Sequence, residues 1–88
     1  MRICVPTLGG DGLASEVSEH FGRAPVFTLF DTESGEIQTM LNISEHMGGT
    51  GTPPEHLSEY QISVVLCRGL GPKAVHMLQD YGIEVYVG

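Results

Sequence analysis

The feature that most constrains the fold is a strand–helix–strand pattern in the second half of the chain. The run Ile62–Cys67 is almost wholly apolar, which is typical of a strand buried on both faces of a parallel sheet. Pro72 opens a helix that Gly82 ends, and Ile83–Val87 follows as another strand. The predicted helix has an apolar stripe of four residues, Ala74, Val75, Leu78 and Tyr81. Because strands joined in this way run parallel with a right-handed crossover, an α/β fold is predicted.

The first half of the chain predicts three further strands. Arg2–Pro6 is short and mostly apolar, and Pro25–Asp31 is rich in β-branched and aromatic residues. Glu36–Asn42 returns after a turn at Gly35, so the second and third strands form a hairpin. A polar, glycine-rich loop is expected over residues 42–52. A helix is expected to begin at the proline pair 53–54 and to turn Leu57 and Tyr60 toward the core.

This connectivity brings three loops to one edge of the sheet. We expect the first strand to run parallel to the two strands of the second half, with the hairpin descending and returning beside it. The loops His20–Arg23, Asn42–Thr52 and Cys67–Gly71 then lie together at the carboxyl end of the parallel strands. Open α/β sheets bind their ligands at this edge.

Length and charge exclude several classes of protein. The 88 residues predict a single domain over residues 1–88. The net charge of −7, with only four Lys and Arg residues, argues against a nucleic-acid partner. The apolar runs are too short to span a membrane, and the chain enters a strand directly after Met1. We therefore expect a cytoplasmic protein. Its two cysteines, Cys4 and Cys67, lie in strand patterns and are expected to be reduced thiols.

Basic residues gather at the predicted loop edge. Arg23, Arg68 and Lys73 lie in or beside the three loops, whereas Arg2 lies elsewhere. Lys73 falls in the first turn of a helix, where its charge opposes the helix dipole. Such a placement is understandable if an anion binds there, since the backbone N–H groups of Gly69–Lys73 would point at it. The alternative is that these charges only keep the surface soluble.

The same loops hold potential metal ligands. His20 and His46 lie in converging loops, and Cys67 ends the strand beside them. Imidazole and thiolate groups suit soft or borderline metals and metal–sulfur clusters. The spacing is not that of a structural zinc site, so an open, assembled site is predicted. The alternative is that the histidines are solvent-facing or capping residues. His56 is expected to be structural and His76 exposed.

No enzyme signature is recognisable in the sequence. Neither a Ser/His/Asp nor a Cys/His arrangement has the expected pattern. A nucleophile pair of Cys67 and His20 is conceivable, but so short a chain offers it no evident substrate pocket. We predict a protein without enzymatic activity.

The run Ser18–Ala24, with the sequence SEHFGRA, resembles the signature of the dinitrogenase iron–molybdenum cofactor biosynthesis family, which includes NifX-like domains, the NafY core and the C-terminal part of NifB. The resemblance covers nearly the whole chain. It extends to Asn42, to the loop around His46, to the glycine turn Gly69–Pro72 and to the run Gly82–Tyr86.

The resemblance implies a fold and a role. The fold is ribonuclease H-like, a three-layer α/β arrangement with a five-stranded mixed sheet in the order 3-2-1-4-5. The family's final C-terminal helix has no counterpart before Gly88. Family members bind, carry or shield iron–sulfur or iron–molybdenum cofactor precursors without catalysis. By position, His20 would be the leading cluster ligand, Arg23 its electrostatic partner and His46 a second ligand.

The sequence therefore predicts a non-enzymatic carrier or scaffold for an anionic iron–sulfur or molybdenum-containing cluster. The expected cofactor-binding residues are His20, Arg23, His46, Cys67, Arg68, Gly69, Gly71 and Lys73, of which His20, His46 and Cys67 would ligate metal. Proteins that donate or accept the cluster would be its partners, and the chain would be a monomer or a weak homodimer. Two alternatives remain: a protein–protein interaction module, and a small-anion or nucleotide site using the same loops.

Overall fold

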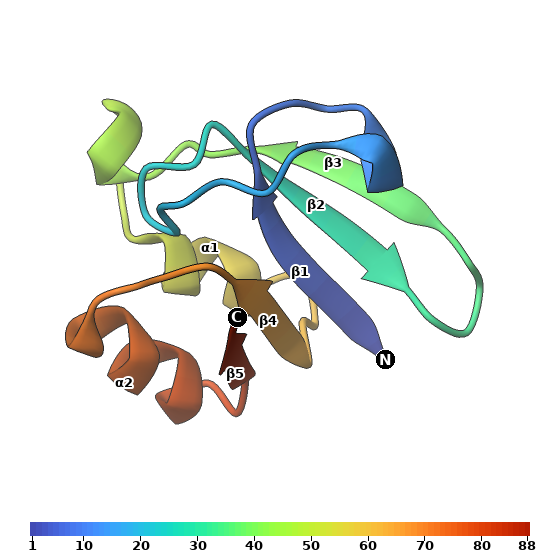
Figure 1. The fold of residues 1–88 in the computed structure, drawn as a ribbon. Helices are drawn as coiled ribbons and strands as arrows, with labels where there is room; N and C mark the ends of the chain where they lie inside the picture. Colours follow the sequence, from blue (N-terminus) through green and yellow to red (C-terminus); the bar gives the residue numbers. More distant parts are fainter.

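The computed structural model describes all residues from 1 to 88 and contains one five-stranded sheet flanked by two α-helices (Figure 1). The sheet has the order β3-β2-β1-β4-β5. Its strands are β1 (Arg2–Thr7), β2 (Val26–Asp31), β3 (Ile37–Leu41), β4 (Val64–Cys67) and β5 (Glu84–Val87). The α/β class, the mixed sheet and its order are confirmed.

Strand direction follows the predicted connectivity. β1 pairs with β2 and β2 with β3 in antiparallel fashion, whereas β1 with β4 and β4 with β5 are parallel. Helices α1 (Pro53–Ser58) and α2 (Pro72–Asp80) precede the two last strands. The carboxyl ends of β1, β3 and β4 therefore lie at the same edge of the sheet, and the segments that follow them come together there.

A single hydrophobic core lies between one face of the sheet and both helices. Leu57 of α1 and Leu78 of α2 are fully buried in the same cluster as Cys4 and Val65 of the central strands. The two helices contact each other, and Figure 1 shows them near one another. None of the helices is long and apolar enough to cross a membrane.

The opposite face of the sheet has no helix. Over β3 it is contacted by the segment with the short 3-10 turn η1 (Gly12–Ala14), and most of the strand's side chains stay exposed. Over β4 and β5 it is open: Leu66 and Tyr86, paired across the two strands, are 40% and 56% exposed. The structure thus has its two α-helices on one face of the sheet.

Several element boundaries differ from the sequence predictions. β4 begins at Val64 because Gln61 adopts a left-handed φ of 57°, which turns the chain before the strand. Ile62 nevertheless joins the core from this turn. Tyr81 is the C-cap of α2 and is exposed, so its predicted place in the apolar stripe is wrong. The predicted 42–52 loop contains a 3-10 turn, η2 (Glu45–Met47).

Candidate functional site

The three segments at the carboxyl edge enclose a cavity of about 610 Å³. It is lined by residues 20–23 after β1, by parts of 45–54 around η2 and α1, and by parts of 69–77 around the start of α2. Six of the eight residues expected in the site line it: His20, Arg23, His46, Gly69, Gly71 and Lys73. Cys67 and Arg68 do not.

Apolar side chains form the base and one wall of the cavity. Phe21 is only 2% exposed, and its ring packs on Phe27 at 5.4 Å between centroids with the planes tilted by 51°. Pro53 and Pro54 are buried in the first turn of α1 and also line the cavity. The turn they open is capped by Thr52, whose Oγ1 accepts a hydrogen bond from the N–H of Glu55.

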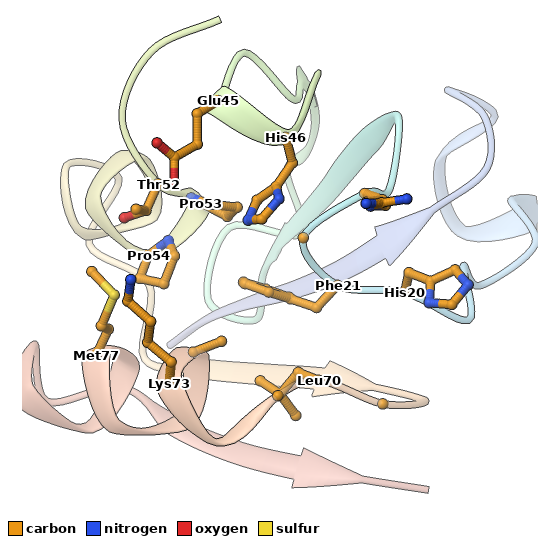
Figure 2. A pocket seen from close by; sticks show the side chains of 15 residues that line it. His20, Phe21, Glu45, His46, Thr52, Pro53, Pro54, Leu70, Lys73 and Met77 are labelled. Atoms are coloured by element: carbon orange, nitrogen blue, oxygen red, sulfur yellow. The ribbon is translucent and has the colours of Figure 1, made fainter. Parts of the chain in front are cut away.

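Two polar side chains from different elements line the hollow. Figure 2 shows the ring of His46, on η2, near Pro53 and Phe21, whereas the side chain of Lys73, on α2, extends toward Pro54 beside Met77. Met77 follows Lys73 by one helical turn and lies on the same face of α2. The ring of His20, by contrast, lies at the rim and points away from His46 and Lys73 (Figure 2).

The cavity carries positive charge in an acidic protein. Its charged lining residues are Arg23, Lys73 and Glu45, so the local balance is two positive charges against one negative, in a chain of net charge −7. Neither Arg23 nor Lys73 takes part in a salt bridge. The structure's salt bridges involve the N-terminus and Arg2, so the cations at the cavity are available to an anion.

The start of α2 adds backbone donors to this charge. The first-turn N–H groups of Lys73 and Ala74 have no partner within the helix. The N-cap residue is Gly71, which has no side chain to bond them, and Pro72 occupies the first helical position. Backbone N–H groups of this kind, at the positive end of a helix dipole, bind anions.

The structure places Cys67 away from the cavity. Its side chain is 5% exposed within the core, and its Sγ donates a weak hydrogen bond to the carbonyl oxygen of Tyr86 at 3.9 Å. Burial raises the pKa of the Cys67 thiol, with the N–H of Gly69 acting in the opposite direction. Because the thiolate is the form that ligates metal, the structure does not present Cys67 as a ligand. Burial raises the pKa of Cys4 still further.

The three predicted metal ligands are not assembled in one place. No group of three or more His, Cys, Asp or Glu side chains is arranged to hold a metal ion. His46 and His20 lie on different segments of the rim, and Cys67 is in the core. His56 is bonded through Nε2 to the carbonyl oxygen of Thr50 at 2.7 Å, in a structural role, and His76 is exposed.

Sequence reasoning missed two contributors to the site. Met77 lines the cavity, and its spacing of four residues from Lys73 on a predicted helix would have placed both on one face. The other is Asn42, which is 7% exposed and whose amide bonds two of the loops together. The family resemblance includes Asn42, but the sequence pattern did not indicate that its side chain is buried between the loops.

Comparison with known proteins agrees with this fold. The family model of the dinitrogenase iron–molybdenum cofactor family matches residues 1–88, so the chain belongs to that family.

Individual relatives show how far the similarity reaches. An uncharacterised protein of Methanocaldococcus jannaschii, MJ0580, is 31% identical over 77 residues, which cover 82% of this chain and 65% of that protein. The chain thus spans just under two thirds of that relative's length. The apo form of the orange protein from Desulfovibrio gigas superposes with a TM-score of 0.82 at 28% identity, covering 96% of this chain and 72% of that one. A putative NifB protein from Thermotoga gives a TM-score of 0.78 at 29% identity, covering 99% and 75%.

Proposed function

We propose that this protein binds and carries an anionic metal–sulfur cluster, of the iron–sulfur or molybdenum-containing kind, in the cavity between its three carboxyl-edge segments. The observation that carries the proposal is that His46 and Lys73, a metal-binding and a cationic side chain from different elements, line one cavity. Membership of the iron–molybdenum cofactor family and similarity to a protein solved in an apo form support it.

The donors around the cavity suit such a cargo. The imidazole of His46 and the thioether of Met77 are ligands for soft or borderline metals. Metal–sulfur clusters carry negative charge on their sulfur atoms, which Lys73, Arg23 and the free N–H groups of α2 would offset. Phe21 and the proline pair would shield one side of a cluster from water, a desolvation cost that these cations and N–H groups would offset.

The proposal changes the expected ranking of the ligands. His46 becomes the principal ligand, because its ring faces the hollow, whereas His20 takes a place at the rim. Cys67 is left out because it is buried in the core, and Arg68 because it does not line the cavity. A site with one inward-facing imidazole and no enclosing set of ligands suits a cargo that is received and passed on.

We propose further that the protein acts without catalysis. Both thiols are held protonated by burial, and neither lines the cavity, so no cysteine nucleophile faces a ligand there. Its partners would then be proteins that donate or accept the cluster. The protein itself would act as a monomer or a weak homodimer.

The direct test is to map the binding of tetrathiomolybdate by NMR under anaerobic conditions. We expect the amide signals of Gly22, His46 and Leu70–Lys73 to shift together, and those of Glu84–Tyr86 on the open sheet face to stay. His46→Ala should abolish most of the shift, whereas the matched control His76→Ala, on the exposed side of α2, should not. Absence of any shift in the wild type would overturn the proposal.

A second probe separates the small-anion alternative. Inorganic phosphate would use the same cations and N–H groups but offers no metal atom to the imidazole of His46. The site would be one for small oxyanions if phosphate produced the same shifts as tetrathiomolybdate with the same affinity, and if His46→Ala changed the binding of neither anion. We expect phosphate to bind more weakly and to perturb only the segment Gly69–Lys73.

A further inference from the structure

We infer that Asn42 is the positioning residue that holds the ring of His46 over the cavity. The inference rests on the proposed function for its consequence, but its geometry belongs to the free protein. Asn42 follows β3 directly and is almost completely buried. It neither lines the cavity nor contacts its interior.

The amide of Asn42 joins two of the three cavity segments. Its Nδ2 donates to the carbonyl oxygens of Gly22 and Ala24, each at 2.8 Å. Its Oδ1 accepts from the backbone N–H of Ser44 at 3.0 Å. Both donors and the acceptor are therefore used, and each faces a backbone group of the opposite kind. A carboxylate of the same shape would place an oxygen against two carbonyl oxygens, so this arrangement requires an amide.

The bond to Ser44 leads directly to His46. Ser44 is the N-cap of η2, the single turn that carries His46. Its carbonyl oxygen accepts hydrogen bonds from the N–H groups of Met47 at 3.0 Å and Gly49 at 2.9 Å. The neck of this segment is closed by a bond from the N–H of Thr50 to the carbonyl oxygen of Ile43 at 3.1 Å. The position of η2 is thus set by the residues that Asn42 anchors.

The bonds to Gly22 and Ala24 fix the surface on which the ring rests. A Cβ atom added to Gly22 would lie 3.2 Å from Cδ2 and 3.4 Å from Nε2 of His46. The imidazole therefore lies against the backbone of Gly22, at a distance that only glycine permits without displacement. Asn42 holds both sides of this contact, since it binds the carbonyl of Gly22 and the N–H at the start of η2.

The consequence is that Asn42 holds the ring of His46 in place before any cargo binds. Without the amide, the segments 20–24 and 42–52 lose their only shared side-chain hydrogen bonds, and the ring of His46 is free to leave the hollow. Residues that orient a metal ligand from behind typically change metal affinity 10- to 100-fold when replaced. Asn42→Asp should accordingly weaken tetrathiomolybdate binding by about that factor, without removing any group that touches the cargo.

The test uses the free protein and therefore does not depend on the cargo. In the wild type we expect a nuclear Overhauser effect between the ring proton on Cδ2 of His46 and the α-protons of Gly22, together with slowly exchanging Nδ2 protons on Asn42. Asn42→Asp should remove the contact. The control Gln38→Glu, the same amide-to-carboxylate change at an exposed position of β3, should leave it intact. A contact that persists in folded Asn42→Asp would overturn the inference.

A second variant serves if Asn42→Asp does not fold. Gly22→Ala should push the ring of His46 away while leaving the Nδ2 protons of Asn42 protected, because the alanine Cβ is directed at the ring. Rapid exchange of those protons in the wild type would contradict the inference without any variant. If Asn42→Asp lost the His46 contact but bound tetrathiomolybdate as tightly as the wild type, the role of Asn42 in positioning His46 for binding would be refuted. The proposed function of the cavity would stand.

Discussion

Phe21 is the residue through which the His-Phe-Gly-Arg run joins the core. Its side chain is buried against Phe27, while the residues on either side of it reach the rim of the cavity. The buried ring explains why an aromatic residue occurs in a polar loop. It anchors the loop to the core and so fixes the positions of Gly22 and Arg23 at the cavity. In agreement with this role, Phe21 belongs to the core cluster.

Replacing Phe21 by alanine should destabilise the protein strongly. Large-to-small changes at fully buried aromatic positions cost about 3–5 kcal/mol of unfolding free energy, a large part of the stability of a small domain. Urea denaturation of Phe21→Ala and of the exposed control Leu13→Ala measures the difference. The control should change the free energy of unfolding by less than about 0.5 kcal/mol. Similar midpoints for the two variants would show that Phe21 is not an anchor.

The two cysteines should be unreactive in the folded protein. Burial raises the pKa of both thiols, so the thiolate that reacts with disulfide reagents or metals is scarce below their shifted pKa values. Thiol titration at about pH 8, near the ordinary cysteine pKa, should be slow in buffer and fast in urea. Rapid labelling of Cys67 in the native state would return it to the set of candidate ligands.

At the scale of elements, α1 matters for the site although it has only six residues. Pro53 and Pro54 form its first turn and a wall of the cavity at once. The turn depends on Thr52, which accepts the N–H of Glu55 and donates to the carboxylate of Glu55 in return. Such a reciprocal cap stabilises a short helix that has little length of its own to rely on.

Thr52→Ala should therefore loosen the start of α1. Loss of an N-cap side chain costs about 1 kcal/mol. The matched control is Thr50→Ala, since the hydroxyl of Thr50 makes no hydrogen bond and only its backbone is bonded. Thermal unfolding of the two variants compares them directly, and amide exchange of Glu55 and His56 reports on the helix itself. Equal stability of both variants would contradict the capping role.

The arrangement of the three segments could be predicted from the sequence, whereas the direction of the histidine rings could not. Connectivity alone predicts that the segments after β1, β3 and β4 meet, because strand direction is a property of the chain order. The ranking of His46 over His20 depends on where each ring points, which is decided by the bonds of Asn42 and the bare backbone of Gly22. Neither of these contacts between distant residues has a pattern in the sequence.

Cys67 illustrates the opposite error. Its place at the end of β4 correctly indicated nearness to the loop edge. Strand alternation, however, turns its side chain to the same face as Val65 and into the core. Alternation along β4 predicts that Cys67 and Val65 share one face of the sheet. It does not predict that the two helices cover this face, because that depends on the packing of the whole chain.

At the scale of the whole molecule, charge is distributed unevenly. The protein is acidic overall, yet its cavity has a local excess of one positive charge from Arg23 and Lys73 against Glu45. The protein as a whole therefore does not attract anions, whereas the local charge of the cavity favours one there. Leu66 and Tyr86, on the open face over β4 and β5, do not line this cavity.

The measurement that tests the account most directly is anaerobic reconstitution with iron, sulfide and molybdate, followed by desalting, absorption spectroscopy and metal analysis. We expect the wild type and His76→Ala to retain a sulfide-bridged chromophore with matching metal content. His46→Ala should lose most of it, and His20→Ala less, because only the ring of His46 faces the hollow. A wild-type protein that emerges free of metal, or a His46→Ala variant that retains as much as the wild type, would contradict the account.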